Sequence, residues 1–194
     1  MQNTKGTLNL ILGPMFSGKT TQLNTELTKF ADLGASCLKI VHSLDTRNDV
    51  PSNDYCGSTH NSSYTQLTKK IKVVRTDNLA NVDINGYQVI SIDEAQFFTN
   101  LYNIIYDWVE NKGLKVWVAS LSGDYKKEKF GEVCNLIPLA DNILKLNAIC
   151  VYCFKKSGKL NCNASFTKRI TSNMDQQLIG GSDSYVATCR KHHC

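Results

Sequence analysis

The feature that most constrains the fold is an eight-residue segment, Gly13-Pro14-Met15-Phe16-Ser17-Gly18-Lys19-Thr20, which fits the pattern G-x-x-x-x-G-K-[ST]. An apolar run at residues 8–12 precedes it, and a helical pattern follows it from residue 19 to about residue 33, ending before Gly34. Backbone N–H groups in such a loop point at phosphate oxygens, and the positive end of the following helix adds to the field. We therefore predict an ATP-binding loop in which Lys19 reaches the β and γ phosphates and Thr20 ligates Mg²⁺.

The rest of the chain alternates short apolar runs with longer helical stretches. The runs with strand character are residues 8–12, 37–42, 89–92, 116–119 and 143–146. Strands separated by crossovers of this length predict an α/β fold with a parallel sheet. Residues 43–63 are rich in Asn, Asp, Ser and Thr and indicate a long loop. After residue 146 cysteines and short polar runs replace the alternation, so we expect a phosphate-loop core at 1–146 and a small lobe at 147–194.

An acidic pair follows the third apolar run. Asp93 and Glu94 come directly after residues 89–92, as in a Walker-B strand. We expect Asp93 to hold Mg²⁺ and Glu94 to accept the proton of the group that attacks the γ-phosphorus. Both reach one site only if the strand breaks after Ile92, because successive strand residues point to opposite faces. The letters Asp-Glu-Ala-Gln at 93–96 also match the motif of nucleic-acid helicases, which is the alternative interpretation.

Cysteine and histidine residues in the C-terminal part have metal-ligand spacing. Two chelating pairs occur, Cys150-x-x-Cys153 and Cys189-x-x-His192. Such pairs favour one structural Zn²⁺ over a redox dithiol. A lobe of about 48 residues cannot fill a core of its own, so a metal is physically needed there. Cys162, His193 and Cys194 are further donors nearby, which leaves the fourth ligand less secure than the first three.

Composition bounds the cellular setting. The N-terminal residues show no secretory signal pattern, and the apolar runs are far shorter than the ~18 residues of a membrane span. We expect a cytoplasmic chain with reduced thiols and no membrane partner. Residues 147–194 hold seven Lys or Arg and two Asp or Glu, whereas the rest of the chain is balanced. The positive charge of this lobe supports an alternative hypothesis, in which the protein is a zinc-containing ATPase that acts on nucleic acid.

Nearly the whole chain resembles the type II thymidine kinases, the cytosolic and poxvirus-like branch. The segments that carry the resemblance are Gly13 to Thr20, Asp45-Thr46-Arg47, Ser58-Thr59-His60, Ile92-Asp93-Glu94-Ala95-Gln96-Phe97-Phe98, Phe130-Gly131, Pro138-Leu139-Ala140, Phe166-Thr167-Lys168-Arg169, Ile179-Gly180-Gly181 and the four metal donors. The resemblance implies a RecA-like core, a zinc-bound lobe and a lasso loop over the nucleoside. It also implies a homotetramer, a nucleoside substrate and no nucleic-acid partner.

The implied activity is transfer of the γ-phosphoryl of ATP to thymidine or deoxyuridine. Carried over by position, Glu94 resembles the general base and Arg47 a cation near the transferred group, with Asp45 and Gln96 also on the cofactor side. The residues that resemble the nucleoside site are Met15, Phe97, Leu121, Tyr125, Thr167, Leu178, Ile179, Gly180 and Tyr185.

Two segments depart from the family pattern. Ser122 stands where the family usually carries Asp, and the segment between Cys153 and Thr167 is longer than usual. We expect a protruding loop in the longer segment.

Overall fold

The computed structural model describes residues 5–45, 71–158, 160–178 and 180–193. A six-stranded sheet forms its centre, and every neighbouring pair in the sheet is parallel. In spatial order the strands are β3 (Ile71–Thr76), β2 (Cys37–His42), β4 (Val89–Asp93), β5 (Lys115–Leu121), β1 (Thr7–Gly13) and β6 (Asn142–Lys145). The five predicted strands and the parallel sheet are confirmed. The strand β3 was not predicted.

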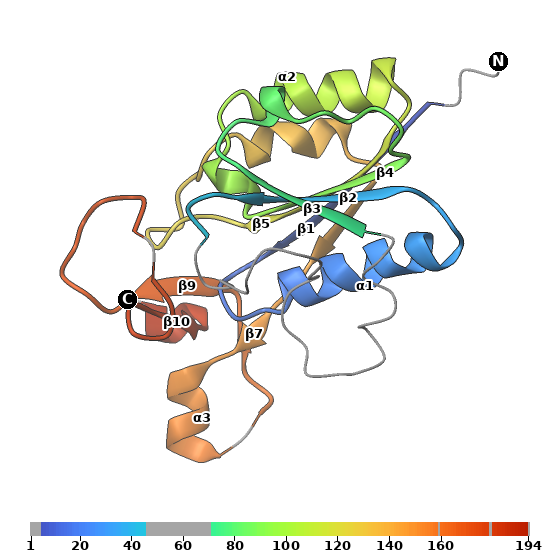
Figure 1. The fold of residues 1–194 in the computed structure, drawn as a ribbon. Coiled ribbons are helices and arrows are strands. Elements are labelled where there is room, and N and C mark those ends of the chain that lie inside the picture. The colour runs from blue at the N-terminus through green and yellow to red at the C-terminus, as the bar shows by residue number, and fades with distance from the viewer. Residues whose placement is uncertain (1–4, 46–70, 159, 179, 194) are drawn as a thin grey trace.

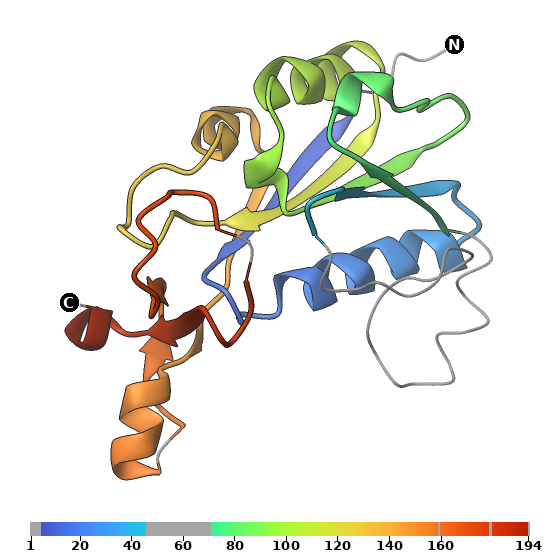
Figure 2. The same ribbon diagram turned by 60° about the vertical axis from the view of Figure 1, so that its left-hand side comes forward.

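Helices cover both faces of the sheet (Figures 1 and 2). On one face lies α1 (Lys19–Asp32). On the other lie α2 (Leu101–Tyr106), its π-helical continuation η5 (Asp107–Asn111) and the 3₁₀ segments η3 (Leu79–Asn81) and η6 (Val133–Leu139). The helix prediction is confirmed: α1 starts at Lys19, and Gly34, at φ 89°, donates its N–H to Ala31 O.

Alternating side chains of β1 divide between the two layers, as the pleat of a strand requires. Leu8, Leu10 and Leu12 join the large apolar cluster beneath α2 and η6. Ile11 packs with Leu23 of α1 and Ala119 of β5 on the opposite face. Both faces of the sheet are therefore buried, as expected of parallel strands.

The C-terminal lobe consists of two short antiparallel pairs and two short helices. The strand β7 (Ala148–Ile149) pairs with β8 (Asn163–Ala164), and β9 (Phe166–Arg169) pairs with β10 (Tyr185–Thr188). Helices α3 (Val151–Ser157) and α4 (Arg190–His193) complete it. The division at 146/147 falls between β6 and β7.

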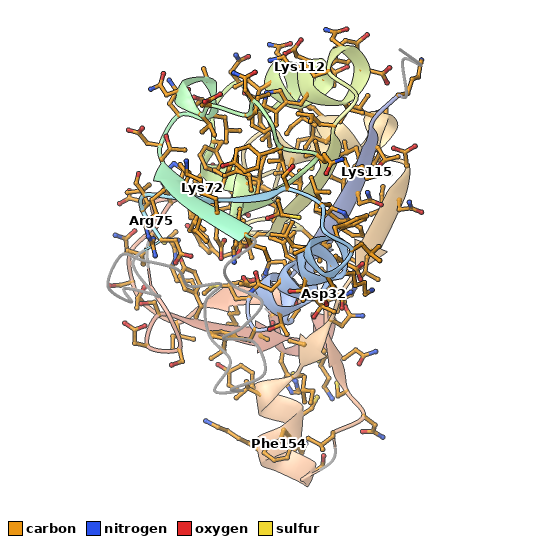
Figure 3. The ribbon with its side chains drawn as sticks, turned by 45° about the vertical axis from the view of Figure 1, so that its right-hand side comes forward. Asp32, Lys72, Arg75, Lys112, Lys115 and Phe154 are labelled. Carbon is orange, nitrogen blue, oxygen red and sulfur yellow. The ribbon has the colours of Figure 1, made fainter. Side chains whose placement is uncertain are left out.

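The long segment after Cys153 does protrude, but the expected loop is in part a helix. Phe154, on α3, lies at the end of the molecule remote from the sheet, whereas Lys112 lies beyond the α2 layer at the opposite end (Figure 3). Among the described helices, none is both long and apolar enough to cross a membrane.

Candidate active site

The phosphate loop has the local conformation that its sequence predicts. Phe16 and Gly18 adopt left-handed backbone, with φ of 63° and 80°. A side chain at Gly13 would meet Ser17 Oγ and would lie 3.0 Å from Leu146 O. Lys19 is buried, and its Nζ donates to Pro14 O at 2.8 Å, so the ammonium lies within the loop. The loop thus turns tightly around a cation at the start of α1.

Two oxygen donors suited to Mg²⁺ meet at the end of β4. The Thr20 hydroxyl hydrogen-bonds the carboxylate of Asp93, which joins the phosphate loop to this strand. Burial raises the pKa of Asp93, while the ammonium of Lys39, 3.7 Å away, acts in the opposite direction. Lys39 Nζ also donates to Asn24 Oδ1 at 2.7 Å. Oxygen ligands of this kind are the ones that Mg²⁺ prefers.

Glu94 lies where the strand breaks. The chain turns at Glu94 into left-handed backbone, φ 51°, and a 3₁₀ turn, η4 (Ala95–Phe97), follows. Gln96 Nε2 donates to Glu94 Oε2 at 2.5 Å, and Gln96 Oε1 accepts from Ser120 Oγ at 2.8 Å. Strand β4 includes Asp93, one residue beyond the predicted break, and the turn still brings both acids to one edge of the sheet.

A pocket opens beside Glu94, between the core and the lobe. The predicted site residues in its lining are Met15, Asp45, Glu94, Gln96, Phe97, Leu121, Tyr125, Thr167, Leu178, Gly180 and Tyr185. Thr167 joins the two parts of the molecule, because its Oγ1 accepts from the Met15 N–H at 2.9 Å. The cavity has a volume of about 40 Å³, well below the ~300 Å³ of small ligand pockets. The free space of the pocket is therefore narrow in this conformation.

The pocket is closed by the described residues of the segment 170–184, which we call the lasso loop. Arg169, at the end of β9, donates to the carbonyl oxygens of Asn173, Asp175 and Gln176. Its guanidinium also donates to Tyr185 Oη at 2.6 Å and lies over the Tyr125 ring, 3.9 Å from the centroid. The buried Arg169 side chain therefore holds the lasso loop by hydrogen bonds to three of its carbonyl oxygens.

Side chains from the core hold the other side of the lasso loop. Tyr125 Oη donates to Met174 O at 2.7 Å. Gln176 Nε2 donates to Asp124 Oδ2 at 2.8 Å, and Asp124 Oδ1 accepts from the backbone of residues 126 and 128. Tyr185 Oη in turn donates to Leu178 O at 2.8 Å. The loop is therefore positioned by hydrogen bonds more than by apolar packing.

Some predicted residues lie elsewhere. Arg47 and Ile179 fall outside the described residues. The remaining loop positions, Gly13, Pro14, Phe16, Ser17, Gly18, Lys19 and Thr20, do not line this pocket but adjoin it through Met15. Phe98, at the end of one of the segments that carried the resemblance, belongs to the core.

Five lining residues were not predicted, namely Leu44, Asp124, Phe130, Arg169 and Gln176. Phe130 and Arg169 occur in segments that carried the family resemblance, so a signal for them existed. No sequence signal marks Leu44 or Gln176 as a lining residue, because only the folded path of the chain brings them to the pocket.

The four predicted metal donors converge. The ligand atoms of Cys150, Cys153, Cys189 and His192 all lie within 4.8 Å of one another. His192 Nδ1 lies 3.6 Å from Cys150 Sγ and 3.4 Å from the sulfurs of Cys153 and Cys189. Tetrahedral zinc with bonds of about 2.3 Å separates neighbouring sulfurs by about 3.8 Å, and the Sγ atoms of Cys153 and Cys189 lie 3.8 Å apart.

One thiol of this cluster is already prepared to ionise. Burial opposes ionisation of Cys150, but hydrogen bonds from the backbone of Cys189 and Cys153 and from the His192 ring lower its pKa to about 6. The thiolate is the form that ligates metals. Donor type and spacing therefore fit Zn²⁺.

Comparison with known proteins identifies the family. The sequence model of the family described as "Thymidine kinase" matches residues 6–193. The chain is 40% identical to the thymidine kinase of fowlpox virus (strain NVSL) over 190 residues, which is 97% of each chain. It is 37% identical to the thymidine kinase of rabbit fibroma virus (strain Kasza), covering 96% of this chain and 95% of the relative. With the human protein named "Thymidine kinase, cytosolic" it shares 35% identity, over 96% of this chain and 73% of the relative. These matches extend over the phosphate loop, the acidic pair and the metal donors alike, and they show that the chain belongs to the thymidine kinase family.

Proposed function

We propose that this protein transfers the γ-phosphoryl group of ATP to the 5′-hydroxyl of thymidine, and of deoxyuridine, giving the 5′-monophosphate. One observation carries the proposal: Glu94 lines an aromatic pocket that adjoins the phosphate loop through Met15 and is covered by the lasso loop. Family membership and the names of the relatives support a nucleoside acceptor over the nucleic-acid alternative.

The phosphate loop and the end of β4 would bind the donor. Backbone N–H groups of the loop and the Lys19 ammonium would hold the β and γ phosphates, with the phosphates replacing Pro14 O as the partner of Nζ. Thr20 and Asp93 would hold Mg²⁺, which when bound neutralises part of the phosphate charge. Catalysis then depends mainly on positioning and on charge neutralisation.

Glu94 would be the general base. Its carboxylate takes the proton of the 5′-hydroxyl as the bond from O5′ to the γ-phosphorus forms and the bond to the β–γ bridging oxygen breaks, releasing ADP. Gln96 orients this carboxylate from the side of β5, since its amide donates to Glu94 and its carbonyl is held by Ser120.

The nucleoside would lie between the core and the lasso loop. Phe97, Tyr125 and Tyr185 present aromatic surface to the base. Backbone groups near residues 178–180 would read the pyrimidine edge. The cavity is narrow in this conformation, so we expect the lasso loop to move outward to admit the nucleoside and to return before transfer. We also propose that Zn²⁺ bound by Cys150, Cys153, Cys189 and His192 fixes the lobe that carries this loop.

The experiment that tests the function measures ADP release from Mg-ATP with thymidine, deoxyuridine, deoxycytidine, single-stranded DNA or no acceptor. We expect turnover that depends on thymidine and yields its monophosphate. Turnover stimulated by DNA and by no nucleoside would contradict the proposal and favour the basic lobe as a nucleic-acid surface.

The same assay tests the base. Glu94→Gln keeps the shape of the side chain but cannot take a proton, so kcat should fall by roughly 10²- to 10⁴-fold with thymidine affinity retained. Glu128→Gln, at an exposed position nearby, is the matched control and should retain wild-type kcat. Unchanged kcat in Glu94→Gln, with intact thymidine binding, would exclude the assignment.

The homotetramer that the resemblance implies and the cytoplasmic location expected from the N-terminal residues and the short apolar runs stay predictions. Sedimentation equilibrium of the purified protein, with and without ATP, measures the first of them.

A further inference from the structure

A second cavity adjoins the pocket that contains Glu94, and Asp124 and Thr167 line both of them. Its volume is about 290 Å³, compared with about 40 Å³ for that pocket, and approaches the ~300 Å³ of small ligand sites. The phosphate loop, residues 13–20 of the described chain, contributes no residue to its lining. The second cavity is therefore distinct from the space that the phosphoryl donor would occupy.

Three cations converge on this cavity from separate elements. Lys127 lies in the turn after β5, Lys145 ends β6, and Arg190 begins α4. The ring centroid of Phe166, in β9, lies 5.3 Å from Lys127 Nζ and 4.7 Å from Arg190 Cζ. Aromatic faces attract cations at such distances, so Phe166 holds two of the three at the cavity. We call the space between these four residues the cationic cavity.

The backbone fixes the walls of the cationic cavity. Lys127 adopts left-handed backbone, φ 69°, and its N–H donates to Asp124 O at 3.1 Å. A long side chain rarely adopts this conformation, and such residues often lie at functional sites. Ser122, also in the lining, donates its N–H to Gly13 O at 3.2 Å, and Lys145 lies in a strand paired with β1. The lining is thus attached to the sheet.

The charge of the cationic cavity is positive. Lys145 Nζ donates to Ser122 Oγ at 2.7 Å. A hydroxyl leaves the ammonium charge in place, whereas the aspartate that the family usually carries at this position would cancel it. Asp124 supplies the one carboxylate among the described lining residues. Its oxygens already accept hydrogen bonds from the backbone of its own turn and from Gln176. Three cations therefore face one carboxylate that is engaged elsewhere.

We propose that the cationic cavity is a second anion site, which binds a small molecule carrying a phosphate or diphosphate group. The guanidinium of Arg190 can hold two phosphate oxygens at once, while Lys127 and Lys145 act as point charges. A cleft lined by charges of one sign concentrates anions of the other. The inference is independent of phosphoryl transfer, and its tests measure binding alone.

The first test titrates inorganic diphosphate into the purified protein by isothermal titration calorimetry, in low-salt buffer without Mg²⁺, because salt screens exposed charges. The wild type should bind one diphosphate at the phosphate loop and another in the cationic cavity. Lys19→Met removes the ammonium of the phosphate loop and should retain the second site. If Lys19→Met bound no diphosphate, the proposal would be overturned.

A carboxylate placed beside Lys145 gives the sharpest change. In the Lys19→Met background, Ser122→Asp should lower the affinity for diphosphate at least about tenfold, and Lys145→Met should do the same. Ser122→Ala removes the hydroxyl but adds no charge, so it should weaken binding less. Lys156→Met, which removes an exposed positive charge from α3, is the matched control and should bind like its parent. Equal affinity in Ser122→Asp and Ser122→Ala would contradict the site.

Competition separates the cationic cavity from its neighbours. In Lys19→Met, neither saturating thymidine nor single-stranded DNA should displace the diphosphate. Displacement by thymidine would place the anion in the pocket beside Glu94, and displacement by DNA would make the cavity part of a nucleic-acid surface; either result would overturn the proposal. ADP and inorganic diphosphate, compared in the same variant, identify the source of the group, since the natural ligand is a nucleotide if ADP binds more tightly and a free phosphate anion if it does not.

A second measurement keeps the proposal testable if Lys19→Met does not fold. Crystals of the wild type are soaked in tungstate, whose anomalous scattering locates the anion. Density should appear between Lys127, Lys145 and Arg190 as well as at the phosphate loop. Density at the phosphate loop alone would contradict the second site.

Discussion

The sheet core and the C-terminal lobe are stabilised by different interactions. In the core, large apolar side chains are almost fully buried on both faces of the sheet, among them Leu8 and Phe98 on the α2 face and Leu27 on the other. Each contributes about 1.5 to 3 kcal/mol of burial. The apolar cluster of the lobe consists of Ala148, Cys150, Ala164 and Ala187, with three further cysteines against it. The comparison teaches that the half of the pocket contributed by the lobe depends on polar contacts and on the metal that we propose for the Cys and His cluster.

The largest effect is expected from removal of the metal ligands. Cys150→Ser together with Cys153→Ser leaves two of the four proposed donors, so Zn²⁺ should be lost along with about 10 kcal/mol or more of binding free energy. Limited proteolysis should then cleave the lobe rapidly while circular dichroism shows the sheet core still folded, and thymidine-dependent turnover should disappear.

Cys134→Ser is the control for this double variant and should keep its zinc and its resistance to cleavage. If the whole chain of the double variant unfolded cooperatively, core and lobe would form one folding unit. The claim that they are stabilised by different interactions would then be wrong.

An intermediate effect is expected at the arginine beneath the lasso loop. Arg169→Met keeps the length of the side chain but removes its donors to Asn173, Gln176 and Tyr185. Hydrogen bonds from charged groups contribute about 1.5 to 3 kcal/mol each, so the KM for thymidine should rise at least tenfold, measured by steady-state kinetics with zinc content unchanged.

Lys129→Met, at an exposed position, should leave that KM unaltered. If Arg169→Met bound thymidine as tightly as the wild type, Arg169 would not be needed to position the lasso loop. The remaining contacts of the lobe would then be sufficient.

The smallest effect concerns the pH dependence of the core. His42 packs against Phe97 and Phe98, and its Nδ1 accepts from the Leu44 N–H at 3.1 Å. Burial lowers its pKa from 6.5, although the carboxylates of Asp77 and Asp45 act the other way. The unfolded chain therefore binds this proton more readily, and the free energy of unfolding should fall as pH drops below about 6.5.

Urea titrations at several pH values measure this slope. His42→Phe should be less stable than the wild type at pH 8, because the Leu44 N–H loses its acceptor, but its stability should decline less between pH 7 and 5. The same slope in both proteins would assign the acid sensitivity to other groups.

Local signals account for what could be predicted. The phosphate loop, helix α1 and five of the six sheet strands follow from contiguous residues whose glycines, apolar runs and spacing act over short distances. β3 escaped prediction because it is an edge strand on which polar and half-buried side chains alternate without a continuous apolar run. The longer segment after Cys153 was expected to be a loop, and its first turns are the helix α3.

The contacts that assemble the candidate site join residues far apart in the chain. Lys39 pairs with Asp93, Asp124 with Gln176, and Thr167 with Met15. No local pattern encodes these partners, since each depends on the path of the backbone through the sheet and the lobe.

By itself the sequence predicted the family and the fold class, and it singled out the phosphate loop and the four Cys and His residues that converge in the lobe, because these depend on residue types at short, fixed spacings. Only the tertiary structure decided how the lasso loop covers the pocket and that Arg169 holds it. The physical reason is distance along the chain: a hydrogen bond or a metal ligand acts over a few ångströms in space, and folding alone brings such groups within that reach.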